Sequence, residues 1–451
     1  MTEPRKSGHP GIAQPERGRV GRLGRLVDWV DRRAARIATV VGVGYAVAGI
    51  GYAVALGDRL RYFDEQVYVG LAADLVAGHG YTLDHVHPTA YRPPGYPFLL
   101  AGVDALGGGI VAMRLLGVAA LVGLVWLAYR FGVLVHGRVA GALAATATGC
   151  YPLLVFTAGT LYPQVHAAFL LLLGLYLALR GTAPENRARR GRYLVGAGVS
   201  FGLLILAVPT FGPSVLAVAG WLAWRHRRAA VRPVAVLLLV AAVLPAAWAV
   251  RNAVTLRAFV PVSTNNGVNL LLGNSEHATA GGGRVVDISA YEAQARDRGL
   301  SEVEQDAFYR DQATAWIRAH PADAAVLYAG KVVNNFNYRN ELATSGQNSA
   351  ARDLVSALSF YPLLLLFTLR LVPARRRPMT SLERLLICVV LGNVLLLAVF
   401  YTRLRFRVPL DAVMIISSAA ALADLVIRAT GGGHDRVSVG TRTTSSGATT
   451  P

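Results

Sequence analysis

The sequence predicts an all-α, polytopic membrane protein that crosses the bilayer about ten times. Of the 451 residues, 54% are hydrophobic and only 16% are charged, whereas a soluble domain carries roughly 25% charged residues. Several long stretches contain no charge, and a helix of ~20 apolar residues is enough to cross ~30 Å of hydrocarbon. Basic residues gather in the connections between these stretches, as they do in membrane proteins.

The uncharged stretches predict the spans in order. Residues 37–56 predict a first span that stays in the membrane as an anchor. The run 139–179 is too long for one helix and predicts a pair broken near Thr157–Pro163, and 193–224 predicts a tighter pair broken at Pro209–Pro213, because proline interrupts a helix. The single spans that remain are 115–129, 233–250, 354–369, 385–402 and 408–427.

Basic clusters predict the orientation of these spans. The clusters at 187–192 and 225–228 share one side only if 193–224 crosses twice, whereas one tilted helix would separate them. Short loops rich in Lys and Arg remain in the cytoplasm. We therefore expect one transmembrane domain, 37–427, in the cytoplasmic membrane, with disordered cytoplasmic tails at 1–36 and 428–451. Outside would lie a first loop at 57–109, a lobe at 251–352 and a turn at 402–407.

The net charge of +19 and the few metal-ligating residues exclude other classes. The basic residues are dispersed between apolar runs, so they form no nucleic-acid-binding face. Cys150 and Cys388 lie in apolar runs, and we expect them to be small core side chains without a disulfide. The His85-x-His87 pair and the nearby His79 lack a third well-spaced ligand. We therefore predict neither a metal nor a cofactor.

The first outer loop predicts two short helices. Residues 62–77 favour an amphipathic helix along the membrane surface, with Asp64 and Glu65 in its first turn. These acidic residues either stabilise the helix start through its dipole or supply a general base at the membrane surface. Pro93 and Pro94 impose an extended connection beside Arg92 and introduce a second helix at 97–106, although such a pair also simply marks a helix start.

The later outer segments predict a small helical lobe. Asn265, Asn266 and Asn269 form either tight turns or a polar loop that offers amides to a sugar or phosphate. A capping box at Ser301 begins a helix that stops near residue 320. A second helix follows and carries Lys331 near its end, and the charges at 292–311 are expected to form a solvated face.

Three arginines, Arg403, Arg405 and Arg407, lie at the start of the last span, on the side where basic residues are scarce. They suit a lipid phosphate, which guanidinium groups bind bidentately. Contact with anionic headgroups, or a side chain extended toward the interface, is the alternative explanation. Arg251 and Lys331 complete the cluster on the phosphate interpretation.

Four segments carry a resemblance to a known family. They are the D-E pair followed by Tyr68 and then TAYRPPGYPFLLA, the segment 251–274, the segment 309–331, and RFRVP at 405–409. In this order they resemble the integral-membrane GT-C glycosyltransferases, in particular the branch of protein O-mannosyltransferases and lipid A aminoarabinose transferases. The resemblance runs through most of residues 37–427. One departure is Val208, which stands where relatives often have an arginine before proline.

The resemblance implies an inverting transfer of one sugar from a polyprenyl-phosphate donor to a hydroxyl of a glycan, lipid or protein. The active site would lie on the outer side of the cytoplasmic membrane, in contact with the membrane lipids. Asp64 is implied as the base, with Glu65 as helper. Arg405 and Arg407 are implied as phosphate ligands, and the secondary donor contacts are Arg403, Arg251, Lys331 and Arg92. Sugar or acceptor contacts are expected from Tyr68, Tyr91, Asn265, Asn266 and Asn269.

Two other functions stay open at this stage. A transporter or flippase for polyprenyl-linked glycans would need several ionisable residues within its spans, and only Arg114, His166, Asp411 and Asp424 qualify. A non-catalytic scaffold for envelope assembly is the second alternative.

Overall fold

The computed structural model describes residues 21–339, 349–372 and 379–430, and this part of the chain is all-α. Its only β-type pairing is an isolated bridge between Thr82 and Pro88. The α-helices are α1 (Arg22–Leu56), α2 (Phe63–Ala77), α3 (Gly95–Ala105), α4 (Ile110–His136), α5 (Arg138–Cys150), α6 (Pro152–Gly159), α7 (Gln164–Thr182), α8 (Arg190–Ala207), α9 (Gly212–His226), α10 (Val231–Thr255), α11 (Asn266–Gly273), α12 (Ser289–Asp297), α13 (Glu302–Ala319), α14 (Pro321–Asn334), α15 (Ala350–Leu371), α16 (Ser381–Leu397) and α17 (Leu404–Ala429).

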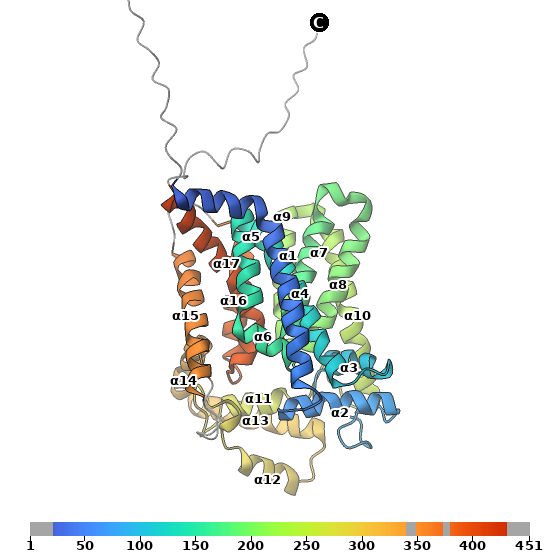
Figure 1. The fold of residues 1–451 in the computed structure, drawn as a ribbon. Helices are drawn as coiled ribbons and strands as arrows, with labels where there is room; N and C mark the ends of the chain where they lie inside the picture. The colour runs from blue at the N-terminus through green and yellow to red at the C-terminus, as the bar shows by residue number, and fades with distance from the viewer. Residues whose placement is uncertain (1–20, 340–348, 373–378, 431–451) are drawn as a thin grey trace, which may run out of the picture.

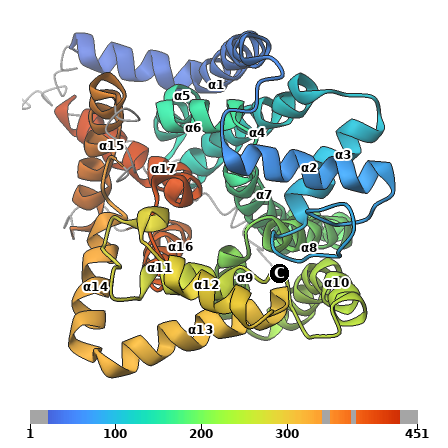
Figure 2. The same ribbon diagram turned by 90° about the horizontal axis from the view of Figure 1, so that it is seen from below.

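The long helices form a bundle, and the short helices cover one end of it (Figure 1). We call this end the outer end; α2 and α3 cover one part of it, and α11, α12 and α13 cover another (Figure 2). Helix α17 packs against α4, α5, α7, α15 and α16, and most of its side chains are buried. The last span is therefore the centre of the fold, and its first turn lies at the outer end.

Seven helical stretches in the described residues are long and apolar enough to cross a membrane, or eight if the bent pair α5 and α6 forms one span. The protein is thus a multi-pass membrane protein, as predicted, although the sequence suggested ten spans. The difference has two causes. Helix α16 has only 17 residues, so it is too short to count as a span. Helix α9 has 15 residues and continues through one turn of 3-10 helix into α10, so the two count as a single stretch, Pro209–Thr255.

Both predicted helix breaks are present. Helix α6 ends at Gly159 and α7 begins at Gln164, while α8 ends at Ala207 and α9 begins at Gly212. One further bend of 50° separates α5 from α6. Pro152 causes it, because the residue before a proline is driven out of the helical region, and Tyr151 has an extended ψ of 114°.

Three sequence predictions about local structure need correction. Residues 22–36 are helical, not a disordered tail, because Val27 packs on Val139 and Ala423; residues 1–20 and 431–451 lie outside the described part. Cys150 and Cys388 are exposed, so they are not core side chains. The helix predicted at 62–77 forms as α2, but its buried face carries the acidic residues.

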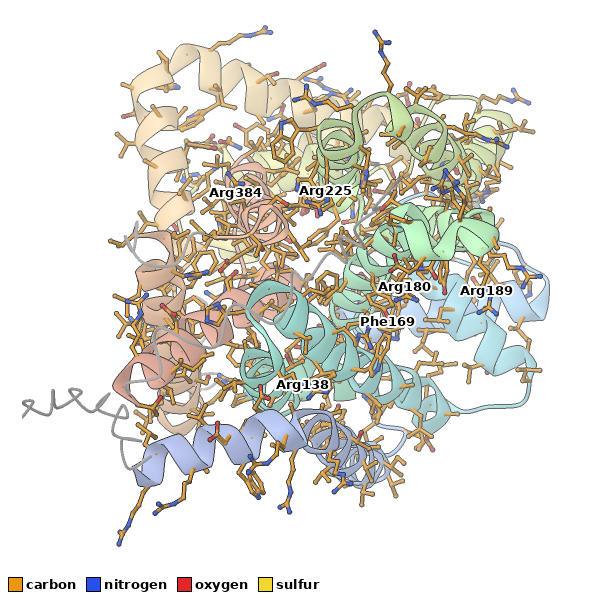
Figure 3. The ribbon with its side chains drawn as sticks, turned by 90° about the horizontal axis from the view of Figure 1, so that it is seen from above. Arg138, Phe169, Arg180, Arg189, Arg225 and Arg384 are labelled. Atoms are coloured by element: carbon orange, nitrogen blue, oxygen red, sulfur yellow. The ribbon has the colours of Figure 1, made fainter. Side chains whose placement is uncertain are left out.

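The basic connections lie at the end of the bundle opposite to the outer end. Figure 3 looks onto that end and labels five of its arginines. Arg138 begins α5, Arg384 lies in the first turn of α16, and Arg180 and Arg225 lie in the last turns of α7 and α9. Arg189 belongs to the connection before α8. A third basic cluster in the sequence, the three arginines at 375–377, lies outside the described residues. This distribution places the arginine-rich connections and the short outer helices at opposite ends.

Two glycines let the outer lobe pack closely on the bundle. A Cβ atom on Gly267 would lie 2.0 Å from the backbone oxygen of Asp306 in α13, and one on Gly273 would lie 2.4 Å from the backbone oxygen of Phe400. The amide of Gly267 also donates to Asp306 Oδ1 at 2.6 Å. Helix α11 is therefore fixed between α13 and the turn before α17 by backbone contact.

Gly267→Ala should lower the melting temperature of the detergent-solubilised protein, because forced overpacking typically costs about 1–3 kcal/mol. The control is Gly42→Ala in α1, where an added Cβ meets nothing within 4 Å and where alanine favours a helix more than glycine does. Equal melting temperatures for Gly267→Ala and the wild type would contradict the close contact between α11 and α13.

Candidate active site

A cleft opens between the outer end of the bundle and the outer lobe. It encloses about 920 Å³ of space, part of it open to solvent. Its walls come from α2, the loop before α3, the start of α7, the turn between α8 and α9, α11, the end of α16 and the start of α17. The lining residues are Tyr68, Arg92, Pro93, Pro163, Gln164, Ala207, Val208, Pro209, Thr210, Ser263, Asn265, Asn266, Asn269, Leu397, Phe400, Tyr401, Arg405, Phe406 and Pro409.

Asp64 joins the two arginines that line this cleft. Arg92 donates to one carboxylate oxygen of Asp64 and Arg405 donates to the other. Asp64 comes from the first turn of α2, Arg92 precedes α3, and Arg405 lies in the first turn of α17. The Asp64 side chain is buried next to the two arginines that line the cleft. The predicted meeting of a first-loop carboxylate with an arginine of the last helix is therefore present.

Each of these two arginines keeps an N–H group without an acceptor. The Nε atoms of Arg92 and Arg405 are buried and have no hydrogen-bond partner among the described residues. Aromatic rings fix both groups, because the guanidinium carbon of Arg92 lies 5.7 Å from the Tyr68 ring centre and that of Arg405 lies 5.2 Å from the Tyr162 ring centre. Unpaired buried donors are rare in proteins, and both of these arginines line a cleft that suits an anion.

Arg92 is kept in its charged form. Burial alone lowers the pKa of Arg92, but the neighbouring Tyr68 and Asp64 raise it, and the net effect is a pKa above the ordinary value. The side chain of Arg405 is 21% exposed, so it is the more accessible of the two guanidinium groups.

Glu65 does not share the position of Asp64. Its Oε2 atom accepts from the backbone amides of Arg61 at 2.8 Å and Tyr62 at 3.1 Å. Its Oε1 atom accepts from Arg114 Nη1 at 3.1 Å and from the backbone amide of Leu161 at 3.0 Å. Both oxygens are engaged and the side chain is buried. Glu65 therefore belongs to a hydrogen-bond network with Arg114 and the backbone around it.

Arg407 does not line the cleft either. Its Nε donates to Asp411 at 2.8 Å, and its Nη1 donates to the backbone carbonyls of Asn335 at 2.7 Å and Asn337 at 2.6 Å. The side chain is 1% exposed. This arginine ties α17 to the segment after α14, so it is not placed as a direct phosphate ligand.

Lys331 is fully buried and holds the end of α11. Its Nζ donates to the carbonyl of Gly273 at 2.9 Å and to Asn274 Oδ1 at 3.1 Å. Burial lowers the pKa of Lys331 from 10.5 to about 8. A cation at a helix C-terminus is favourable, and Lys331 is not among the residues that line the cleft.

The other two predicted arginines lie around the cleft without lining it. Arg251 donates to the carbonyl of Thr89 at 2.7 Å and lies 4.8 Å from the Trp248 ring centre, so it braces the first outer loop. Arg403 precedes α17 and lies close to Gly283 of the outer lobe. A Cβ atom added to Gly283 would lie only 3.0 Å from the Nε atom of Arg403.

The predicted polar contacts divide between two pockets. Tyr68, Asn265, Asn266 and Asn269 line the cleft, and the asparagines at 266 and 269 belong to helix α11, so the tight-turn explanation is wrong for them. Tyr91 lines an adjoining pocket with about 740 Å³ of space, part of it open to solvent. Its lining residues are Tyr91, Thr264, Val268, Glu292, Arg296, Glu302, Gln305, Asp306 and Tyr309.

Two residues of the site escaped the sequence analysis. Gln164 lines the cleft at the start of α7, and its buried Oε1 has no partner among the described residues; its position just after Pro163 was the available signal. Glu302, expected on a solvated face, accepts from the amide of Ala90 at 2.9 Å and from the Thr264 hydroxyl at 2.6 Å. It therefore joins the first outer loop to the lobe.

The ionisable residues within the spans are mostly paired inside the fold. Arg114 bonds Glu65, and Asp411 bonds Arg407. Asp424 pairs with Arg428 one turn further along α17. These contacts account for three of the four residues that a transport pathway would have used.

Glu65→Ala should destabilise the protein by about 3–5 kcal/mol, because it leaves the buried Arg114 charge without its partner. Thermal unfolding in detergent would measure the loss. The double variant Glu65→Gln with Arg114→Met removes the charge as well and should recover part of the stability. If the double variant is no more stable than Glu65→Ala, the buried charge is not the cause.

Lys331 predicts a stability change at alkaline pH. The folded protein binds the Lys331 proton with a pKa of about 8, against the ordinary 10.5. Between these values the unfolded chain binds more protons, so stability rises with pH in this window. The melting temperature of the wild type relative to Lys331→Met should therefore increase from pH 8 toward pH 10. Parallel profiles for the two proteins would contradict the burial of a charged lysine.

Comparisons with known proteins give one family match. Residues 91–250 match the family model for dolichyl-phosphate-mannose-protein mannosyltransferase. This segment runs from Tyr91 to the outer part of α10 and contains the cleft residues Arg92, Gln164 and Val208. A search of curated proteins finds no significant match.

Solved structures of similar architecture are larger proteins. The archaeal oligosaccharyltransferase AglB from Archaeoglobus fulgidus, in complex with an inhibitory peptide and a dolichol-phosphate, is 17% identical with a TM-score of 0.48, over 86% of this chain and 50% of that one. The same enzyme tethered with an acceptor peptide is 16% identical with a TM-score of 0.49, over 88% and 52%. ArnT from Cupriavidus metallidurans bound to undecaprenyl phosphate is 14% identical with a TM-score of 0.40, over 86% and 78%.

The chain spans about half the length of the archaeal oligosaccharyltransferase. The matched segment begins at Tyr91, within the motif TAYRPPGYPFLLA. The multi-pass all-α fold is consistent with this family match. Over residues 91–250 the chain is therefore similar to the dolichyl-phosphate-mannose-protein mannosyltransferase family, within a multi-pass all-α membrane protein.

Proposed function

We propose that this protein transfers one sugar from a polyprenyl-phosphate carrier to a hydroxyl acceptor on the outer side of the cytoplasmic membrane. The observation that carries the proposal is the pair of cleft arginines, Arg92 and Arg405, held by the carboxylate of Asp64. The matched family is named for a dolichyl-phosphate-linked sugar donor, which belongs to the donor class that we propose. No cofactor enters the scheme.

The lipid phosphate would bind to Arg405 and Arg92 in the cleft. Each arginine has a buried Nε–H group without an acceptor, and a phosphate oxygen would satisfy it. A phosphate competes with Asp64 for the same guanidinium groups, so its arrival would loosen the two ion pairs. Arg407, Arg403, Arg251 and Lys331 would support this site through the surrounding segments, and Tyr68 and the three cleft asparagines would contact the sugar.

Asp64 would act as the general base. The acceptor hydroxyl oxygen attacks the anomeric carbon from the face opposite the phosphate, and the bond between that carbon and the phosphate oxygen breaks. The hydroxyl proton passes to the Asp64 carboxylate. The leaving polyprenyl phosphate takes the electron pair, and the fixed arginines stabilise its added charge. A single displacement of this kind inverts the anomeric configuration.

The acceptor would approach from the adjoining pocket of the outer lobe. Ser263 and Asn265 line the cleft while Thr264 lines the second pocket, so the two spaces share one wall. The second pocket is rich in carboxylate, amide and phenol groups, which suit a hydroxyl-bearing glycan, lipid or protein segment. Tyr91 precedes Arg92 directly, and Glu302 accepts a hydrogen bond from the amide of Ala90 in the same loop.

The orientation that we propose follows from the arginine-rich connections. They lie at the end of the bundle opposite to the cleft (Figure 3), and short basic loops stay in the cytoplasm. Both termini would then be cytoplasmic, and the cleft would open outside, at the level of the outer lipid headgroups.

Asp64→Asn should reduce sugar transfer by about 10²–10⁴-fold, the usual contribution of a general base, while polyprenyl phosphate still binds. Arg405→Gln should instead weaken that binding. Transfer is measured with a panel of radiolabelled polyprenyl-phosphate sugars in membranes, and binding by native mass spectrometry. The matched control is Asp84→Asn, which changes an exposed carboxylate of the same loop.

Full transfer by Asp64→Asn would reject the base assignment. The enzyme proposal itself fails if the wild-type protein moves the lipid-linked sugar across vesicles and forms no glycoside, since a flippase has that behaviour.

A further inference from the structure

Three side chains converge at the end of α2, apart from the cleft. They are Asp74, His79 and His85, and one ligand atom of each lies within 4.8 Å of the other two. Asp74 Oδ1 is 2.5 Å from Nδ1 of His85 and 3.5 Å from Nδ1 of His79. The Asp74 side chain is buried, whereas both imidazole rings are exposed. The group is thus anchored on its acidic side and open to solvent on the other.

The geometry is close to that of a zinc site. Tetrahedral Zn²⁺ has bonds of roughly 2.0–2.2 Å to His nitrogen and carboxylate oxygen, which puts neighbouring ligand atoms about 3.3 Å apart. The separation between Asp74 and His79 already fits this value. The shorter contact of His85 needs a displacement of less than about 1 Å, which an exposed ring can make. Two imidazoles favour Zn²⁺ over the oxygen-preferring Ca²⁺ and Mg²⁺.

The surroundings orient the Asp74 carboxylate. Its other oxygen, Oδ2, accepts a hydrogen bond from the Thr82 hydroxyl, so Oδ1 is left to face the two histidines. Such an outer hydrogen bond is the usual support of a metal-binding carboxylate. His85 has a φ of 65°, an uncommon conformation for a residue other than glycine, and it turns the chain so that the ring meets Asp74.

The third ligand is the one that the sequence lacked. The His85-x-His87 pair suggested a pair of ligands without a partner, but His87 bonds Asp84 at 2.6 Å instead. The fold replaces it by His79, at the start of the loop, and adds Asp74 from the helix. Sequence spacing does not show this arrangement because the loop between residues 78 and 88 closes back on α2.

We propose that Asp74, His79 and His85 bind one Zn²⁺ ion, with water completing the coordination. The ion would clamp the loop that leads to Arg92. The amide of Thr89 donates to the carbonyl of Tyr81 at 2.9 Å, and the Tyr81 hydroxyl donates to the carbonyl of Arg92 at 2.9 Å. A metal at the base of this loop therefore stabilises the backbone beside the cleft, and it takes no part in the sugar transfer.

The test uses the full chain in detergent, stripped with a chelator and titrated with Zn²⁺ against a chromophoric zinc indicator. The wild type should bind one equivalent, and His85→Ala and Asp74→Asn should lose affinity by at least about tenfold. The matched control is His87→Ala, which removes a histidine two residues away and should bind as the wild type does. Zn²⁺ should also raise the melting temperature of the wild type, and Mg²⁺ should not.

Equal zinc affinity in the wild type and His85→Ala would overturn the proposal, as would a loss in His87→Ala as large as that in His85→Ala. Size-exclusion chromatography identifies a variant that fails to fold, and His79→Ala, which changes the more weakly bonded histidine, then provides the second test. Zinc binding is measured directly, so an absence of zinc binding would leave the glycosyltransferase proposal intact. Conversely, a loss of sugar transfer in Asp64→Asn would not support the metal site.

Discussion

The carboxylate of Asp64 bonds two arginines that lie 28 and 341 residues away along the chain. It thereby joins the first outer loop to the central helix at the point where the cleft opens. In a site of low polarity, a buried charge of this kind is tolerable only with partners of opposite sign. The position of each guanidinium group thus depends on the same side chain, and so does the electrostatic character of the cleft.

Neighbouring residues of like charge perform different tasks here. Glu65 closes the helix start and neutralises Arg114, whereas Asp64 faces the cleft arginines. Similarly, Arg405 reaches the cleft while Arg407 pairs with Asp411 in the interior. A helix turns by 100° per residue, so residues one or two positions apart point in different directions. Duplicated charges in these motifs are therefore not interchangeable.

The sequence predicts most of the helices because their determinants are local. Uncharged runs indicate where the long helices lie, and the prolines at Pro163 and Pro209 mark two of their breaks, whereas the bend at Pro152 and the number of spans were not predicted. The separation of Arg405 from Arg407 could also have been deduced from the helical period. The burial of Lys331 and the bonds of Glu302 could not, because they depend on how the outer lobe folds back onto the bundle. The grouping of Asp74 with two histidines depends equally on loop closure.

The wall between the two pockets has little freedom to move. Backbone contacts at Gly267 and Gly273 fix both ends of α11, and Lys331 holds its last carbonyl. Under the proposed function, a bulkier acceptor would therefore meet a partition that does not shift. A change of acceptor preference would then be expected through exchange of lining side chains such as Tyr91 and Tyr309, with the scaffold around them left unaltered.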